Sequence, residues 1–287
     1  MQISTPATAA NPTPPPAAGS KAAVRDWWNR ESCGEELAVG DEELSQLRAQ
    51  EKARYELEPY IFDHAKFTEA AGRDVLEIGV GMGADHLQWA RAKPKSLNGV
   101  DLTPRAIEIT NRRFQLEGYQ SKLQVADAEK LPFTDASFDT VYSWGVVHHS
   151  PDTQKAYGEI RRVLRPGGTA RVMIYQDRSL TGYMLWARYA LMQGRLTRSL
   201  KDVCSEQLQG PGEKTYTPAE TRAMFAAAGF SKCDIAVQVC HGDLLNGPVG
   251  ARHRGVGLTI ARNIWPRWFI TRFMKNHGLY LVITARA

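Results

Sequence analysis

A glycine-rich segment at residues 77–83 is the first place where residue types and spacing indicate chemistry. It reads Glu-Ile-Gly-Val-Gly-Met-Gly and comes at the end of the apolar run of residues 73–79. Glycine allows a tight turn and a close approach of the backbone to a ligand, because it has no Cβ. Asp101 ends the next apolar run, residues 97–101, and an acid there can accept two hydrogen bonds from a ribose diol. These residues predict a nucleotide-like ligand at a strand-to-helix turn.

The glycine pattern by itself fits more than one class of enzyme. Gly79, Gly81 and Ala84 also satisfy the dinucleotide-binding pattern G-x-G-x-x-A. A nicotinamide-dependent oxidoreductase is therefore an alternative at this stage.

Three further segments add specific motifs in a fixed order. They are VADAEKLPFTDASFD at 125–139, SWGVVHH at 143–149 and EIRRVLRPGG at 159–168. Together with the glycine segment, they make residues 73–175 resemble the class I (Rossmann-like) S-adenosylmethionine-dependent methyltransferases, in particular the type 11 and ubiquinone-methyltransferase-like subgroup. The oxidoreductase alternative gives no reason for the 125–139 segment.

The resemblance implies S-adenosylmethionine as cofactor, S-adenosylhomocysteine as product, and a role for each matching residue. Glu77 would lie near the methionine amine, Asp101 would hold the ribose, and Asp127 would accept a hydrogen bond from the adenine amine. Ser143 and Trp144 would lie near the sulfonium. The implied cofactor-binding residues are Glu77, Gly79, Gly81, Gly83, Asp101, Leu102, Asp127, Ala128, Ser143 and Trp144.

Methyl transfer from a sulfonium is an in-line displacement, so the protein must mainly align the reacting atoms. A base is needed only where the nucleophile holds its proton firmly. His148 is the catalytic candidate, with His149 beside it, and a histidine hydrogen-bonded within the loop is the alternative. Tyr55, Tyr175 and Tyr216 are candidates for shaping the pocket.

Other polar residues of these motifs are expected to be structural. Glu129 and Asp135 are interpreted as solvated side chains, and Asp139 as a residue that stabilises the turn into the fourth strand.

From residue 73 onward, β-rich runs alternate with helical patterns, which is typical of a parallel sheet covered by helices. Thr103-Pro104 predicts a helix start and Gly118 its end. Ser150-Pro151 predicts a start and Pro166–Gly168 an end of a later helix, with a strand at 169–175. Thr217–Glu220 has the pattern of a capping box. The predicted fold is α/β, a seven-stranded, mostly parallel, doubly wound sheet with helices on both faces.

The domain organisation follows from composition and motif positions. Residues 1–20 are rich in Pro, Ala and Thr and are expected to form a disordered tail, and 21–287 a single methyltransferase domain. Within it we expect a helical cap at 21–72, a cofactor-binding half at 73–175, and two substrate-lid insertions at 176–216 and 241–278. Trp28, Cys33-Gly34 and Gly210–Gly212 before Tyr216 resemble the flanking regions of bacterial members of the same subgroup, which would cap the active site.

The insertion 241–278 is basic and aromatic. It holds six of the basic residues and one acid: Arg252, Arg254, Arg262, Arg267, Arg272, Lys275 and Asp243. Three interpretations remain open: a surface helix with aromatics packed on the sheet and arginines in water, a lid that binds an anionic acceptor through arginine, and a helix lying on an anionic membrane.

The composition bounds the remaining possibilities. The chain has 43% hydrophobic residues and a net charge of +5, and neither a long apolar run nor a secretory signal is present, so a cytoplasmic protein is expected. Four separated cysteines predict no metal site, and no nucleic-acid-binding module is visible.

We expect methyl transfer to a small molecule, either an anionic acceptor (carboxylate or diphosphate) or a natural-product or isoprenoid intermediate. A lipid- or quinone-like acceptor at a membrane surface and a non-catalytic cofactor-binding partner protein are alternatives. Peripheral membrane contact and a homodimer are compatible with the sequence.

Overall fold

The computed structural model describes residues 20–30, 32, 34–38, 40, 42–208, 210, 212–247 and 255–287. Within these ranges, seven strands form one sheet in the order β3-β2-β1-β4-β5-β7-β6. The strands are β1 (Asp74–Ile78), β2 (Ser96–Asp101), β3 (Lys122–Val125), β4 (Phe138–Trp144), β5 (Leu164–Tyr175), β6 (Lys232–Gln238) and β7 (Tyr280–Arg286). Only β7 among them runs antiparallel to its neighbours. The predicted seven-stranded, mostly parallel sheet is confirmed.

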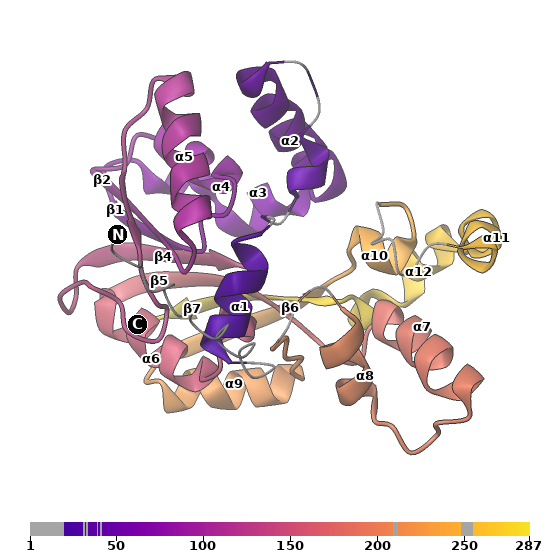
Figure 1. Cartoon of the computed structure of the whole chain (residues 1–287). Coiled ribbons are helices and arrows are strands. Elements are labelled where there is room, and N and C mark those ends of the chain that lie inside the picture. Colours follow the sequence, from indigo (N-terminus) through magenta and orange to yellow (C-terminus); the bar gives the residue numbers. More distant parts are fainter. Residues whose placement is uncertain are drawn as a thin grey trace, which may run out of the picture.

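Helices cover both faces of this sheet (Figure 1). The helices α4 and α5 lie on one face, and α6 and α9 lie on the other. The helices of the sheet-forming region are α4 (Ala84–Arg91), α5 (Pro104–Glu117), α6 (Thr153–Val163) and α9 (Pro218–Ala227), with the short 3-10 helix η3 (Val147–His149). The expected layering is therefore confirmed as well.

Local sequence signals explain where these helices begin and end. Thr103 caps α5 by accepting a hydrogen bond from the backbone of Ala106, and Gly118 ends the helix in the left-handed conformation at φ +74°. Thr217 and Glu220 form the predicted reciprocal capping box of α9.

The helix before β5 differs from the sequence prediction at both ends. It begins at Thr153, because the Asp152 side chain accepts a hydrogen bond from the Lys155 backbone at 3.0 Å. It ends at Val163, and β5 starts directly at Leu164, whose buried side chain belongs to the core and whose backbone pairs with Phe138. Pro166–Gly168 therefore interrupts the register of the strand and does not end the helix.

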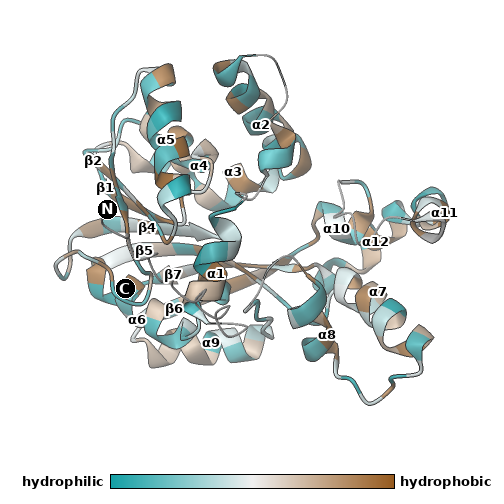
Figure 2. Cartoon of the chain, in the orientation of Figure 1, coloured by the Kyte–Doolittle hydropathy of each residue, from teal (hydrophilic) through white to brown (hydrophobic). Residues whose placement is uncertain are grey.

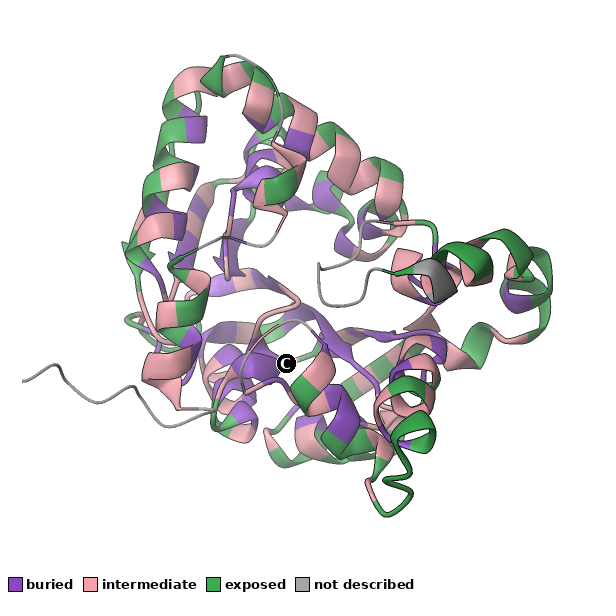
Figure 3. Ribbon diagram, turned by 45° about the vertical axis from the view of Figure 1, so that its right-hand side comes forward, coloured by how far each residue is buried: buried purple, intermediate pink, exposed green. Residues whose placement is uncertain are grey.

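The core divides between the two faces of the sheet, and buried residues follow the strands (Figure 3). On one face, Tyr157 of α6 and Phe225 of α9 pack against the strands. On the other, Trp89 of α4 and Phe114 of α5 pack with Ile61 from the N-terminal region. Burial of side chains this large supplies most of the stability of the sheet region.

The N-terminal region is helical, and its role as a cap stays a prediction. It contains α1 (Lys21–Trp28), η1 (Glu35–Leu37), α2 (Glu43–Leu57), α3 (Tyr60–Ala65) and η2 (Phe67–Ala70). Ser20, expected to end the tail, instead caps α1 by accepting a hydrogen bond from Ala23 at 3.2 Å. The rest of the expected tail, residues 1–19, lies outside the described residues, as do Cys33, Pro211, Arg252 and Arg254.

The two insertions form a group of helices beyond one end of the sheet (Figure 1). The first contains α7 (Leu180–Tyr189), η4 (Leu191–Gln193) and α8 (Leu200–Gln207), and the second contains α10 (His241–Leu244), α11 (Val256–Ile264), α12 (Arg267–Phe273) and η6 (Lys275–His277). No helix in the described part of the chain is both long and apolar enough to cross a membrane.

One of the three interpretations of the insertion 241–278, a surface helix with aromatics packed on the sheet and arginines in water, is wrong. Trp268 and Phe273 are exposed, whereas Arg267 donates hydrogen bonds to the carbonyl oxygens of Leu244 at 2.9 Å and Arg262 at 2.8 Å. The side chains of Trp268 and Phe273 thus face outward. Arg267 instead donates to two backbone carbonyls, and these bonds stabilise the insertion because unpaired buried carbonyls are costly.

Candidate functional site

A pocket lies at the carboxyl ends of β1, β2 and β4, the usual ligand position in open α/β sheets. The glycine turn after β1 forms one wall of this pocket. Gly79 and Gly83 have φ of +84° and +76°, and a Cβ added to either would come within 3.0 Å of a neighbouring side chain. At Gly81 a Cβ would meet no atom within 4 Å. The close contacts at Gly79 and Gly83 require glycine in the turn, and the open space at Gly81 leaves room for a ligand against the backbone.

Asp101, at the end of β2, joins this turn to the next helix. Its Oδ2 accepts a hydrogen bond from the Gly81 backbone at 3.1 Å, and its Oδ1 accepts hydrogen bonds from the backbone and hydroxyl of Thr103 at 2.9 and 2.8 Å. Burial raises its pKa, although these hydrogen bonds act in the opposite direction. The carboxylate lines the pocket with lone pairs left for a diol.

Eight of the ten predicted cofactor-binding residues line the pocket: Glu77, Gly79, Gly81, Asp101, Leu102, Asp127, Ala128 and Trp144. The other two, Gly83 and Ser143, do not line it. Ser143 is fully buried, and Gly83 packs against Thr110. For all ten residues, the roles as cofactor contacts stay predictions.

The N-terminal helix α1 contributes a contact that the sequence analysis missed. The Lys21 ammonium forms ion pairs with Asp127 and, at 2.7 Å, with Glu129. Glu129 also accepts hydrogen bonds from the Ser150 hydroxyl at 2.6 Å and the Asp152 backbone at 2.9 Å. The expectation that Glu129 is solvated is wrong, since only 7% of it is exposed.

The electrostatics of Glu129 follow from these partners. Burial acts to raise its pKa, but Lys21 and the donors from Ser150 and Asp152 outweigh burial and lower the pKa to about 2.

The other two residues expected to be structural, Asp135 and Asp139, agree with the geometry. Asp135 is largely exposed and pairs with Arg162 at 2.8 Å, and Asp139 accepts a hydrogen bond from the Asp74 backbone at 2.9 Å.

A buried polar network lies along one wall of the pocket. Glu77 contacts His86 at 2.9 Å, and burial, followed by the charge of Asp85, raises the pKa of Glu77. Asp85 accepts two hydrogen bonds from Arg54 at 2.9 and 2.7 Å and one from Tyr55 at 2.9 Å. Arg54 and Asp85 line the pocket, and neither was singled out from the sequence. The one sequence signal for them was an acid in the first turn of the helix that follows the glycine segment.

Acids outnumber bases along the pocket wall. The charged residues that line it are Glu36, Glu58, Glu77, Asp85, Asp101, Asp127, Lys21 and Arg54. Both bases are already paired with acids. Such a surface favours a ligand that carries positive charge.

The other end of the pocket is aromatic. Trp144 lies with its ring centroid 5.9 Å from that of Tyr280, and Tyr175 stacks on Tyr280 at 5.5 Å. All three line the pocket, together with Met173. Of the tyrosines considered from sequence, Tyr55 and Tyr216 do not line it and instead bond to Asp85 and Thr153.

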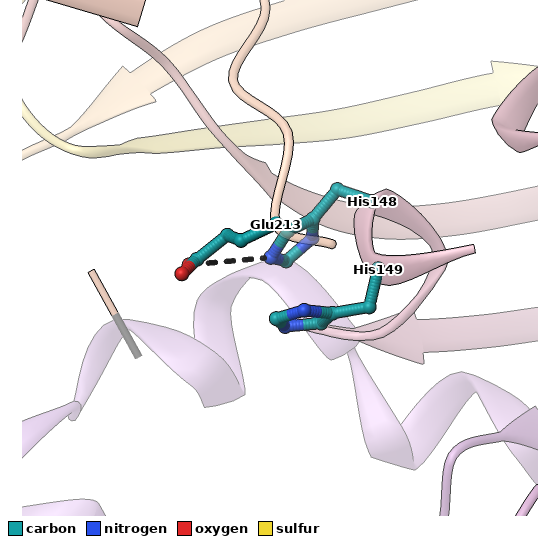
Figure 4. Close-up of side chains that lie close together, drawn as sticks. All are labelled: His148, His149 and Glu213. Atoms are coloured by element: carbon teal, nitrogen blue, oxygen red, sulfur yellow. Dashed lines mark ion pairs between the residues drawn. The ribbon is translucent and has the colours of Figure 1, made fainter. Parts of the chain in front are cut away.

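The two histidines after β4 differ in position (Figure 4). His149 lines the pocket, and its ring lies 5.4 Å from that of Trp28 in α1. His148, the catalytic candidate, is fully buried and does not line the pocket; its ring lies 4.3 Å from the His149 ring. Its catalytic role stays a prediction. Burial lowers the pKa of His149 to about 4, and it lowers the pKa of His148 well below its usual range, so both rings are neutral near pH 7.

His148, His149 and Glu213 form a group that has the donor types of a metal site. His148 Nε2 lies 3.9 Å from Glu213 Oε1, and the three ligand atoms lie within 4.8 Å of one another. Divalent transition metals accept such donors. The Lys214 ammonium contributes to lowering the pKa of His148, however, and its charge would equally oppose a bound cation. We assign no metal to this group, and the expectation of no metal site stays a prediction.

Comparisons with known proteins agree with this geometry. Residues 76–172 match the family model described as a methyltransferase domain. The chain is 35% identical over 100 residues to 27-O-demethylrifamycin SV methyltransferase of Amycolatopsis mediterranei, which is 34% of this chain and 37% of that protein. It is 36% identical over 126 residues to erythromycin 3''-O-methyltransferase of Saccharopolyspora erythraea, which is 42% of this chain and 40% of that protein. The chain thus spans about two fifths of the length of these relatives.

Among solved structures, phosphoethanolamine N-methyltransferase 2 of Haemonchus contortus in complex with S-adenosyl-L-methionine superposes with a TM-score of 0.60. The identity is 17%, and the match covers 92% of this chain and 59% of that one. This likeness concerns the fold.

The sheet order, the reversed β7 and the pocket beside the glycine turn define a class I, Rossmann-like methyltransferase fold. Residues 76–172 are similar to methyltransferase domains, and the two relatives named above are methyltransferases. The ubiquinone-type subgroup, expected from the sequence, is not singled out by these relatives.

Proposed function

We propose that this chain transfers a methyl group from S-adenosylmethionine to a small-molecule acceptor. The observation that carries the proposal is the continuity of one pocket, from the glycine turn and Asp101 to the aromatic wall at Trp144, Tyr175 and Tyr280. The pocket would hold the cofactor at its acidic end and the acceptor at its aromatic end.

The residues present fit such a cofactor. The open space over Gly81 accepts the ligand without a clash, Asp101 offers lone pairs to a ribose, and the excess of acids suits a cationic ligand. When bound, the cofactor supplies a methyl group on a positively charged sulfur, which leaves as a neutral thioether when the acceptor's lone pair attacks. Trp144, at the tip of β4, would exclude water beside the transferred methyl group. His149 lines the same pocket as a neutral imidazole. Alignment of the reacting atoms can lower the barrier by roughly 7–11 kcal/mol.

The acceptor class that we favour is a natural-product-like or isoprenoid small molecule with apolar surface. The aromatic lining supports it, and so do relatives whose names give rifamycin and erythromycin derivatives as substrates. An anionic acceptor held by Arg262 and Arg267 is less favoured, because these arginines bond to backbone carbonyls and do not line the pocket.

A lipid- or quinone-like acceptor at a membrane surface is the second candidate, favoured by the exposed apolar side chains of the insertions. A cofactor-binding protein without transferase activity is the remaining alternative.

A transfer assay with methyl-labelled S-adenosylmethionine and a panel of macrolide aglycones, phenols and prenyl alcohols tests the proposal. The expected result is label in one acceptor class, lost in Gly81→Val, whose side chain would fill the space over the turn. A membrane-lipid extract serves as one further acceptor in the same assay. If the protein binds the cofactor but labels neither the panel nor this extract, the result contradicts the proposal and favours the non-catalytic role.

A further inference from the structure

Helices α7, α10, α11 and α12, with η4 and η6, form an outlying unit, which we call the lobe, made of residues 178–198, 241–247 and 255–277. Its two halves are joined by hydrogen bonds. The backbone of Thr181 donates to Asp243 at 3.0 Å, and the Tyr183 hydroxyl lies 3.2 Å from His277 Nδ1. In Figure 1 the lobe stands away from the helices that cover the sheet.

Exposed apolar side chains are concentrated on the lobe. Of the thirteen exposed large hydrophobic residues in the described part of the chain, nine belong to it: Tyr183, Leu191, Met192, Leu196, Ile260, Ile264, Trp268, Phe269 and Phe273. Figure 2 shows hydrophobic residues on its helices α7 and α12 as well as in the sheet. An apolar concentration of this kind marks a surface that another body covers.

Three of these side chains form a contiguous aromatic cluster on α12. The Phe273 ring lies 5.1 Å from that of Phe269 and 5.9 Å from that of Trp268, and these rings remain 48–73% exposed. The guanidinium of Arg272 lies 5.6 Å from the Phe273 ring. A cation thus lies beside the exposed aromatic cluster.

The charge of the lobe is one-sided. Its one acid among the described residues, Asp243, is fully buried and bonded to backbone donors. Its exposed basic residues are Arg178, Arg188, Arg195, Arg272 and Lys275. The surface around the apolar side chains is therefore positive.

We propose that the lobe docks on the surface of an anionic lipid bilayer, with the α12 aromatic cluster at the acyl boundary and the basic side chains at the headgroups. Exposed tryptophan and phenylalanine beside arginine and lysine are the pattern of helices that lie in a membrane interface. A second copy of the chain fits less well, because two lobes of the same charge would repel one another.

The position of the lobe links it to the pocket. His241, at the start of α10, and Tyr280, three residues after η6, both line the pocket. A docked lobe would place the aromatic end of the pocket near the bilayer. The docking itself does not depend on the proposed function. Entry of an apolar acceptor from the membrane is a further consequence, and it rests on the proposed function.

Vesicle co-sedimentation of the full chain, without cofactor, tests the docking. The protein should bind phosphatidylcholine vesicles that contain a minority of phosphatidylglycerol, and bind pure phosphatidylcholine vesicles at least tenfold more weakly. Replacing Arg272→Gln and Lys275→Gln should weaken the anionic-vesicle partition coefficient about fivefold for each cation removed. Trp268→Ser with Phe273→Ser should lower binding further, at low and high salt alike.

Matched controls lie at the other edge of the sheet. Tyr119→Ser and Lys122→Gln remove an exposed aromatic and an exposed cation near β3 and should leave vesicle binding unchanged. Equal binding to both vesicle types, loss of binding in the controls, or a dimer in solution that the Trp268 and Phe273 variants dissociate would each overturn the proposal. S-adenosylhomocysteine affinity, measured on the same variants, separates this failure from a failure of the proposed methyl transfer.

Discussion

The Lys21 Nζ lies 2.7 Å from Glu129 Oε2, although the two residues are 108 positions apart in the chain. Lys21 belongs to α1, and it also pairs with Asp127, the residue expected at the adenine. Helix α1 is thereby attached to residues 127–129 at the wall of the pocket. Attachment of α1 and binding of the cofactor should therefore be coupled.

We expect Lys21→Met to weaken S-adenosylhomocysteine binding a few-fold with little loss of stability. Lys21 is partly exposed, and such ion pairs contribute about 0.2–1 kcal/mol. The measurement is calorimetric titration beside an unfolding curve, and Lys52→Met, whose pair with Glu56 is exposed, is the control. Unchanged affinity would show that α1 and the cofactor site are independent.

Asp101→Ala should lower S-adenosylhomocysteine affinity by about tenfold to a hundredfold, since hydrogen bonds to a charged group contribute about 1.5–3 kcal/mol each. Asp101→Asn keeps an acceptor for Thr103 and separates ligand binding from stability. Asp135→Ala, which removes an exposed acid of the 125–139 segment, should bind like wild type. Wild-type affinity in Asp101→Ala would refute the ribose assignment.

Two glycines of the same turn should respond differently to alanine. At Gly79 a Cβ would lie 2.2 Å from Val146 Cγ2, so Gly79→Ala should destabilise the fold strongly. At Gly81 there is space but φ is +51°, so Gly81→Ala should cost about 1–2 kcal/mol of stability and mainly reduce cofactor affinity. Urea unfolding and titration of both variants test this, and equal stabilities would contradict it.

Arg267→Ala should destabilise the chain by about 1–3 kcal/mol, because the carbonyls of Leu244 and Arg262 lose their donor. The acceptor KM should stay unchanged in the folded fraction. Arg272→Ala, on the same helix but exposed, is the control and should leave stability unchanged. A raised KM with intact stability would restore the anionic-lid interpretation.

The pH dependence of stability should include His149. Its folded-state pKa is lowered from 6.5 to about 4, so the unfolded chain binds its proton first. The contribution of the neutral His149 to the free energy of unfolding is complete above about pH 6.5 and is lost as the pH falls toward about 4. His149→Asn should reduce the slope of unfolding free energy against pH in that window by about 1.4 kcal/mol per pH unit. An unchanged slope would mean that His149 titrates normally in the folded protein.

Much of the fold was predictable, because the signals that set it are local. The capping of α5 by Thr103 and of α9 by Thr217 needs only neighbouring residues. The end of α6 was mispredicted because Leu164 joins a strand through a long-range pairing with Phe138, which outweighs the local turn signal of Pro166–Gly168.

Part of the pocket lining was predictable, because the glycine turn and the end of the next strand place Gly79, Gly81 and Asp101 there; their contacts with a cofactor stay predictions. Lys21, Arg54 and Asp85 were missed because their roles arise from contacts between distant segments, which spacing along the chain does not encode. The outward-facing aromatics of α12 were misjudged for a related reason. Trp265-Pro266 separates α11 from α12, so one helical periodicity does not extend across both.

The measurement that tests the central claim most directly is a thermal-shift comparison of S-adenosylmethionine, S-adenosylhomocysteine and NADH. At about 100 times Kd a ligand stabilises the native state by about 2.7 kcal/mol, which raises the Tm by several degrees. The account predicts a shift with the two adenosyl ligands and none with NADH. A shift with NADH alone would contradict the methyltransferase assignment and favour an oxidoreductase.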